Sequence, residues 1–99
     1  MSKRVVITGV GVISPIGIGK RAYWDALREG KSGIKSITLF DTRDYKVKVA
    51  GEATDFDPTQ YFFSKRELIN LDRATAMLLI STKEALQDAL NSIKGLKTA

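Results

Sequence analysis

The hydrophobic and polar positions divide the chain into an apolar opening, an alternating middle and a long helical end. Residues 5–8 are a continuous β-branched run, which predicts a strand buried on both faces, as in layered α/β proteins. Residues 14–17 have the composition of a turn, and residues 20–29 then favour a helix that stops at Gly30. The opening is therefore predicted as a strand, a glycine-rich loop and a helix.

The middle of the chain has one clear strand pattern. Residues 32–40 begin with a turn and hold scattered apolar side chains, which predicts irregular structure. Residues 45–49 alternate apolar side chains with lysines, as is typical of a half-exposed strand near the edge of a sheet. Gly51 is expected to end this strand.

Two helix starts precede the long helical end. Asp57 is predicted as an N-cap with Pro58 at the first helical position, and Phe56 and Tyr61 have the spacing of a hydrophobic staple. Residues 64–67 form a second capping box. These signals predict a short helix that breaks and restarts.

From there to about residue 91 the apolar positions recur with helical period, and residues 92–99 are expected to form a frayed polar tail. Residues 76–80 are apolar on every side, so a helix there needs cover on nearly every side. Two strands cannot provide that cover, because two-stranded sheets are marginal on their own. Residues 1–99 are therefore predicted to be one partial domain of a larger layered α/β fold.

The composition of the 99 residues narrows the chemistry. An apolar fraction of 43% and a charged fraction of 27% are those of a globular chain. The absence of Cys and His excludes disulfides, Cys–His and Ser–His–Asp catalysis and His-ligated metals.

The basic residues are dispersed, which is typical of a solvated surface and compatible with an acidic protein partner, and the sequence shows no nucleic-acid-binding motif. No stretch approaches the roughly 20 apolar residues of a membrane span. We expect a cytoplasmic location, because the sequence shows neither cysteines nor a targeting segment.

Two short motifs suggest ligand chemistry, but each has a simpler interpretation. Gly9 and Gly11 follow the predicted strand, as in dinucleotide-binding proteins, yet that fingerprint requires a third glycine where this chain has Ser14. A structural role for the glycines is favoured. Ser32 and Lys35 match the S-x-x-K pattern of acyl enzymes without its companion motifs, so we interpret the match as coincidence.

Two pairs of acidic residues could be considered for acid–base chemistry. Asp57 is accounted for as a helix cap, and Asp55 lies in the approach to it. Glu84 and Asp88 are spaced i, i+4 toward the polar side of the long helix and are expected to be solvated. Trp24 is expected to be a core anchor.

Nearly the whole chain, from about residue 3 to residue 89, resembles the N-terminal part of the β-ketoacyl-acyl-carrier-protein synthases, especially type II. Each motif is weak alone, but the ordered set is specific. The matching segments are residues 5–11 (VVITGVG), 14–17 (SPIG), 24–27 (W-x-x-L), 30–34 (GKSGI), 40–41 (FD), 50–52 (AGE), 55–58 (DFDP), 71–73 (LDR) and 84–89 (EALQDA).

This resemblance implies the N-terminal portion of a layered, thiolase-like α/β fold: strand, helix, edge strand, short helix and long buried helix. It implies an acyltransferase, usually a homodimer, that elongates acyl chains by decarboxylative Claisen condensation of malonyl-carrier-protein in fatty acid or polyketide biosynthesis. The family needs no metal or nucleotide cofactor. Its catalytic Cys and two His residues lie beyond the matched region, so the resemblance assigns no catalytic residue here and implies a scaffold.

One functional surface falls within the resemblance. In the family, basic residues in the segment equivalent to residues 64–72 help to dock the acidic acyl-carrier-protein. Lys65 and Arg66 fit this pattern, whereas Ile69 and Asn70 occupy positions where further basic residues are common. Two other interpretations stay open: a small non-catalytic interaction module, and a subunit completed by another chain, such as a chain-length-factor-like partner.

Overall fold

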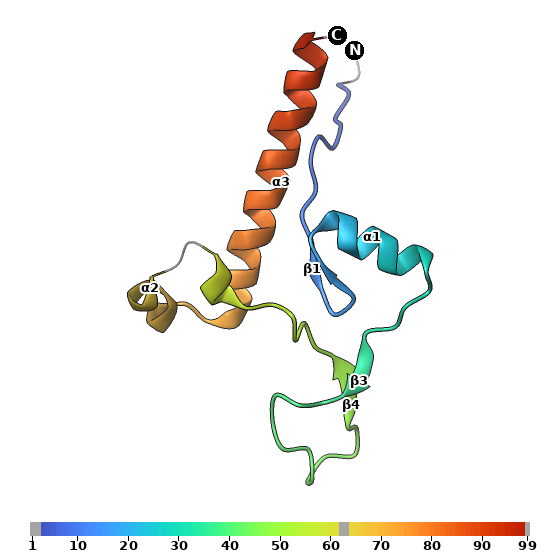
Figure 1. Ribbon diagram of the computed structural model, residues 1–99, viewed down its shortest axis with the longest axis vertical. Coiled ribbons are helices and arrows are strands. Elements are labelled where there is room, and N and C mark those ends of the chain that lie inside the picture. Colours follow the sequence, from blue (N-terminus) through green and yellow to red (C-terminus); the bar gives the residue numbers. More distant parts are fainter. Residues whose placement is uncertain (1–2, 62–63, 99) are drawn as a thin grey trace.

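The computed structural model describes residues 3–61 and 64–98. Its longest element is the C-terminal helix α3 (Arg73–Thr98), and the other elements are arranged around it (Figure 1). The hairpin of β1 and β2 and the helix α1 lie beside α3, and the hairpin of β3 and β4 extends away from its start. The elements are β1 (Ile13–Ser14), β2 (Gly17–Ile18), α1 (Lys20–Arg28), β3 (Ile34–Ser36), β4 (Val49–Gly51), the 3-10 helix η1 (Pro58–Gln60), α2 (Lys65–Asn70) and α3 (Arg73–Thr98).

The molecule is open rather than compact. Its radius of gyration is 17.3 Å, against about 13 Å for a compact domain of this length. The buried apolar side chains in the described part of the chain are Ala26, Phe56 and Ala76. The observed architecture is therefore a mixed α/β segment with very little core of its own.

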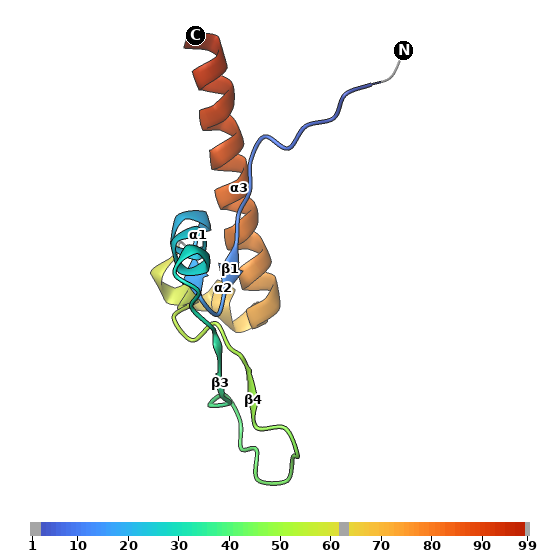
Figure 2. The same ribbon diagram turned by 90° about the vertical axis from the view of Figure 1, so that its right-hand side faces the viewer.

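The predicted strand at residues 5–8 is wrong. These residues are extended and exposed, and Val5 and Ile7 keep 92% and 85% of their surface. Figure 2 shows this N-terminal segment leaving the body of the molecule. A strand requires a hydrogen-bonded neighbour, and no described segment of this chain pairs with these residues.

The first strands lie further along the chain, at the predicted turn. β1 and β2 form an antiparallel hairpin in which Ile13 pairs with Ile18. The Ser14 hydroxyl accepts hydrogen bonds from the Ile16 and Gly17 amides and donates to the Gly17 carbonyl oxygen at 2.9 Å. The turn at residues 14–17 is thus confirmed, and one side chain holds it closed.

The helix predicted for residues 20–29 is confirmed as α1. Gly30 has a φ of +73°, and the amides of Gly30 and Lys31 donate to the carbonyls of Leu27 and Ala26. This is a Schellman stop, which requires the left-handed backbone that glycine readily adopts. Trp24 is 59% exposed, so the expectation of a core anchor is wrong: α1 buries Ala26 and turns the indole outward.

The second hairpin only partly follows the sequence pattern. β3 and β4 pair antiparallel, with Ile34 opposite Gly51 and Ser36 opposite Val49. Irregular structure was the wrong prediction for residues 34–36, and the strand predicted at 45–49 lies instead at 49–51. The Glu52 carboxylate accepts hydrogen bonds from the amides of Thr38 and Leu39. This side chain therefore extends the hydrogen bonding between the two arms of the hairpin beyond the paired strands.

Both predicted helix starts are confirmed. Asp57 accepts a hydrogen bond from the Thr59 amide at 2.9 Å, and the Phe56 and Tyr61 rings stack with centroids 5.7 Å apart. The staple buries Phe56, which also contacts the Arg73 guanidinium. At residues 64–67 the reciprocal capping box is present. Phe56 is therefore the centre of a small cluster of side chains at the start of α3.

The long helical segment differs from its prediction at both ends. The chain breaks at residues 71–72, where Asp72 accepts a hydrogen bond from the Thr75 amide at 2.7 Å and so begins a new helix. α3 then continues to Thr98, so the frayed tail expected from residue 92 is helical as far as the structure describes it. None of the described helices is long and apolar enough to cross a membrane.

Candidate functional site

The two glycines after the extended segment lie directly against α3. A Cβ atom at Gly11 would collide with the Ser81 carbonyl oxygen, and one at Gly9 would meet the Ala85 carbonyl and lie 2.6 Å from the Ala89 amide. Backbone-to-backbone contact of this kind is possible only without side chains. The structural interpretation of Gly9 and Gly11 is thus confirmed.

Glu84 joins three elements, although it was expected to be solvated. Its carboxylate accepts hydrogen bonds from the amides of Val12 and Lys20, both at 2.9 Å. Gly19, at the N-cap of α1, offers no capping side chain. Glu84 of α3 therefore caps α1 from a different helix, and the expectation of a solvated side chain is wrong.

Asp88 lies one turn further along α3 and acts on the same segment. It accepts a hydrogen bond from the Val10 amide at 3.1 Å and forms an ion pair with Lys20 Nζ. The hydrogen bond from the Lys20 side chain, followed by that from the Val10 amide, lowers the pKa of Asp88. Asp88 was also wrongly expected to be solvated.

Together Glu84, Asp88, Lys20 and the amides of Val10 and Val12 form what we call the carboxylate clasp. The sequence interpretation missed it because each of its contacts joins residues 64 to 78 positions apart. One signal was available: two carboxylates spaced i, i+4 lie on one side of the long helix. The clasp fixes residues 10–12 and α1 on α3.

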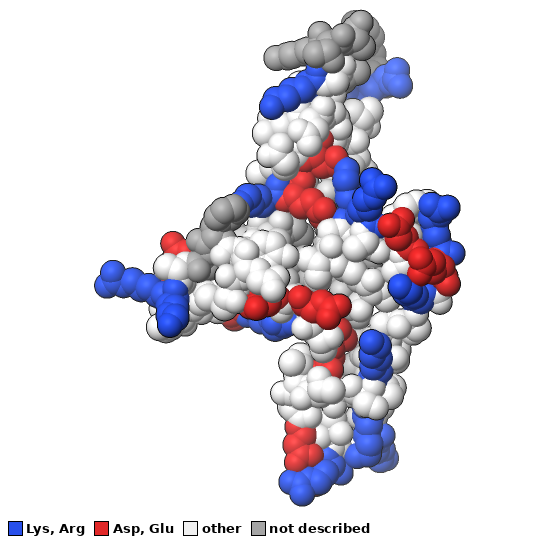
Figure 3. Space-filling view, in the orientation of Figure 1, with Lys and Arg blue, Asp and Glu red and all other residues white. Residues whose placement is uncertain are grey.

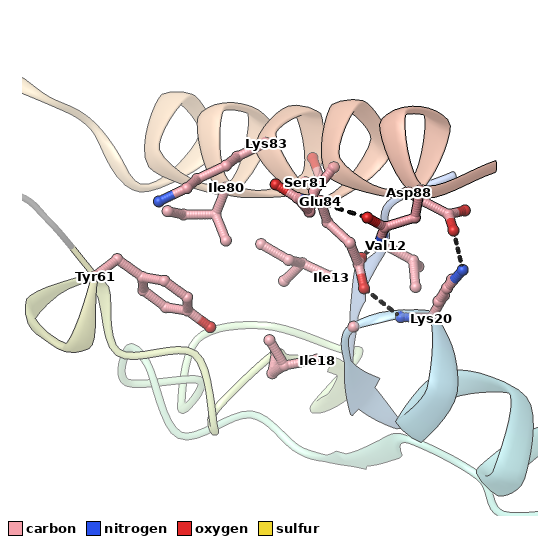
Figure 4. A pocket seen from close by; sticks show the side chains of 13 residues that line it. Val12, Ile13, Ile18, Lys20, Tyr61, Ile80, Ser81, Lys83, Glu84 and Asp88 are labelled. Carbon is pink, nitrogen blue, oxygen red and sulfur yellow. Dashed lines mark hydrogen bonds and ion pairs between the residues drawn. The ribbon is translucent and has the colours of Figure 1, made fainter. Parts of the chain in front are cut away.

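A hollow of about 520 Å³ lies beside the clasp (Figure 4). Ile13, Ile18, Tyr61 and Ile80 provide apolar walls, and the clasp closes one end. The Ser81 hydroxyl donates to the Met77 carbonyl of its own helix at 2.8 Å. Glu84, Asp88 and Ser81 are thus engaged within the protein, and the hollow has the character of a packing surface rather than a catalytic site.

The remaining motifs have structural roles. Asp57 caps η1, and its pKa is lowered mainly by the hydrogen bond that it accepts from the Thr59 hydroxyl. Ser32 accepts a hydrogen bond from the Ile34 amide at 3.2 Å. The cap interpretation of Asp57 is confirmed. Among the described residues, no group of His, Cys, Asp and Glu could hold a metal ion.

Lys65 and Arg66, the predicted docking residues, occupy the first turn of α2 and are exposed. Figure 3 shows basic side chains projecting from this part of the molecule, away from the clasp. Ile69, on the next turn, is 83% exposed. α2 therefore presents two positive charges and an uncovered apolar side chain to solvent.

Comparison with known proteins gives the affiliation of the chain. Residues 2–98 match the family described as "Beta-ketoacyl synthase, N-terminal domain". The chain is 45% identical over 87 residues to the tetracenomycin polyketide synthase ketoacyl synthase alpha subunit of Streptomyces glaucescens, covering 88% of this chain and 20% of that relative. It is 42% identical over 87 residues to 3-oxoacyl-acyl-carrier-protein synthase 2 of Synechocystis sp., with coverage of 88% and 21%.

A solved structure agrees with these relatives. The ishigamide ketosynthase/chain length factor matches with a TM-score of 0.74 and 38% identity, over 85% of this chain and 21% of that one. The chain thus spans about a fifth of the length of the relatives that it matches. Its fold is that of the N-terminal part of a ketosynthase. The chain belongs to the β-ketoacyl synthase family.

Proposed function

We propose that the chain is the N-terminal scaffold of an acyltransferase that elongates acyl chains by decarboxylative Claisen condensation of malonyl-carrier-protein, in fatty acid or polyketide biosynthesis. The observation that carries this proposal is the family match over residues 2–98, with a shared fold at a TM-score of 0.74. The chain has no Cys and no His. The reacting groups are therefore supplied by polypeptide outside these residues, within a layered, thiolase-like and dimeric enzyme.

The scaffold role agrees with what the described residues do. Two contacts hold residues 9–12, α1 and α3 in one arrangement. They are the close approach of Gly9 and Gly11 to α3 and the carboxylate clasp. Pre-set geometry of this kind is what a catalytic site built on neighbouring elements needs from its support. The role is positioning, not chemistry.

Carrier-protein docking at α2 forms part of the proposal. The exposed charges of Lys65 and Arg66 suit an acidic partner, which such charges steer toward the surface. Exposed Ile69 offers an apolar contact at the same place. The capping box holds the first turn of α2, so the two basic residues start from a defined backbone.

A replacement chimera tests the scaffold role. Residues 3–89 of this chain are substituted for the matching segment of the Synechocystis synthase, and condensation is followed as carbon dioxide release from malonyl-carrier-protein in the presence of an acyl-carrier-protein. We expect the chimera to turn over, and the 99-residue chain alone to show no turnover above a no-protein control. A chimera that melts cooperatively yet is inactive would contradict the proposal.

A second candidate is a non-catalytic subunit that is completed by another chain. The observation in its favour is the large uncovered apolar surface, including Leu78 at 65% exposure. Genetic context separates the two candidates: a continuation of the reading frame that encodes a Cys and two His residues supports the scaffold of a synthase. A stop codon after residue 99 supports the second candidate.

A further inference from the structure

A second hollow, of about 660 Å³, lies between α1 and the segment that precedes β1. We call it the α1 hollow. Val10 and Val12 line one side of it, and side chains of α1 line the other. Its volume is within the range of roughly 300–1,000 Å³ that is typical of sites for small organic molecules. The described residues of α3 take no part in it, so it is distinct from the hollow beside the clasp.

Trp24 lines the α1 hollow and is 59% exposed. An open indole is a flat surface on which another planar ring can stack. Arg21 precedes Trp24 by three residues and Arg28 follows it by four, so all three side chains lie on the same face of α1. Both arginines also line the hollow. The indole is therefore flanked by two guanidinium groups.

The charges of Arg21 and Arg28 are not neutralised within the described part of the chain. Both residues are exposed, and no described residue forms an ion pair with either. Lys20 differs from them, because it is paired with Asp88. A rise of about 1.5 Å per residue puts the Cα atoms of the two arginines about 10 Å apart along the helix axis. Two separate guanidinium groups suit a chain of phosphates, with which arginine forms paired hydrogen bonds.

Asp25 is the one acidic residue among the described residues that line the α1 hollow. Its carboxylate disfavours an acidic peptide, in which every recognition group is an anion. A carboxylate does accept hydrogen bonds from ribose hydroxyls, as it does in dinucleotide-binding folds. The indole, the two guanidinium groups and the carboxylate thus match the base, the phosphates and the ribose of a nucleotide.

We propose that the α1 hollow binds a purine nucleoside triphosphate. The base stacks on Trp24, the long side chains of Arg21 and Arg28 bind the phosphates, and Asp25 accepts a hydrogen bond from the ribose. A purine is favoured over a pyrimidine because its two fused rings overlap more of the indole. Binding is non-covalent, and the nucleotide is a ligand rather than a reactant. This inference goes beyond the proposed scaffold function and does not depend on it.

The fluorescence of Trp24 tests the site directly, because the chain contains a single tryptophan. The 99-residue chain is titrated with ATP, CTP, adenosine and a single-stranded oligodeoxyadenylate, and inorganic tripolyphosphate is tested by competition with ATP. Free tryptophanamide in the same solutions corrects for absorption by the bases. We expect saturable quenching by ATP, an affinity at least tenfold lower for adenosine and for tripolyphosphate, and one several-fold lower for CTP. This series uses the unaltered chain, so its outcome does not depend on the folding of a variant.

Substitutions assign the contacts. We expect Trp24→Leu, and separately Arg21→Gln with Arg28→Gln, to lower the affinity for ATP at least tenfold in isothermal titration calorimetry. Arg43→Gln, on an exposed residue of the β3–β4 loop, is the matched control and should leave the affinity unchanged. Circular dichroism checks that each variant keeps its helix content.

Several results would overturn the nucleotide site. They are quenching by ATP that does not saturate, equal affinity for ATP and any of the three smaller or pyrimidine probes, tighter binding of the oligodeoxyadenylate than of ATP, and an affinity for ATP that is indifferent to the substitutions. Failure of the chimera to condense would instead overturn the scaffold function, because none of these titrations measures condensation.

Discussion

Glu84 caps the start of α1, although 64 residues separate it from Lys20 in the chain. A helix start leaves backbone amides without partners, and Gly19 cannot supply an acceptor side chain. The same carboxylate accepts the Val12 amide. At the scale of single residues, the clasp therefore links helix capping to tertiary packing.

Loss of this carboxylate is expected to destabilise the chain. Glu84→Ala removes the acceptor for two amides and should lower the free energy of unfolding by about 1–3 kcal/mol. Urea titration followed by circular dichroism measures the change. The matched control is Glu29→Ala, whose exposed pairing with Lys31 contributes little, so a change within about 0.5 kcal/mol is expected. Equal effects of the two substitutions would contradict the capping role.

Asp88 makes the stability depend on pH in the acid range. The hydrogen bond from Lys20 lowers the pKa of Asp88 in the folded chain, so its contribution is present above the unfolded pKa of about 4. That contribution is lost as the pH falls through the lowered folded-state value. We expect the unfolding midpoint in urea to fall between pH 5 and about pH 3, and Asp88→Asn to reduce this dependence. Identical pH profiles would count against the clasp.

Arg66 is the residue that tests carrier-protein docking. In the active chimera, Arg66→Glu should raise the KM for the carrier-protein substrate several-fold and reduce its dependence on salt, because an exposed ion pair contributes only about 0.2–1 kcal/mol. Lys46→Glu, in the distant β3–β4 loop, is the charge-matched control. An unchanged KM for the Arg66 variant at low ionic strength would remove α2 from the docking surface.

At the scale of elements, the contact between the glycine segment and α3 organises the described fold. Gly11 lies so close to Ser81 that no side chain fits, whereas a Cβ at Gly95 in α3 would meet nothing within 4 Å. Substitution of these two glycines is therefore expected to change the free energy of unfolding in opposite directions. One is required by the approach of two backbones, and the other weakens a helix without a packing reason.

The pair gives a direct comparison by substitution. Gly11→Ala should lower the free energy of unfolding by roughly 1–3 kcal/mol, because the segment must move away from α3. Gly95→Ala should raise it by up to about 1 kcal/mol, since alanine favours the helix. Thermal melts monitored at the helical circular dichroism band measure both. A neutral Gly11→Ala variant would mean that the segment does not rest on α3.

At the scale of the whole molecule, the chain leaves too much apolar surface uncovered to be a tightly packed monomer. Leu78 and Leu79 are 65% and 44% exposed, so among the described residues the apolar run at 76–80 lacks the cover that the predicted long buried helix requires. Each buried side chain of this kind would contribute about 1.5–3 kcal/mol, a large share of the stability of a domain. The isolated chain has little other buried apolar surface to replace this contribution.

We expect the isolated chain to self-associate or to pack loosely. Light scattering should give a mass above the monomer's 10.9 kDa, or else thermal unfolding should be broad with strong binding of the dye ANS. Lys substitutions at Leu86 and Leu90 should reduce self-association. A compact monomer that melts cooperatively and binds no ANS would show that these residues close a core of their own.

The sequence by itself determined the local features and the family. The cap at Asp57, the capping box at residues 64–67, the turn at Ser14 and the stop at Gly30 each depend on atoms within a few residues. Such contacts form wherever the local backbone allows them, so the pattern alone is sufficient. The ordered motifs likewise identified the β-ketoacyl synthases.

Only the tertiary structure decided which polar residues matter and which apolar residues stay uncovered. The clasp joins Glu84 and Asp88 to amides 64 to 78 residues away, and no local pattern specifies such a pairing. Residues 5–8 have the composition of a strand, but a strand exists only when another chain segment donates and accepts its hydrogen bonds. Composition fixes what a segment is able to form, and the neighbours present in space decide whether it forms.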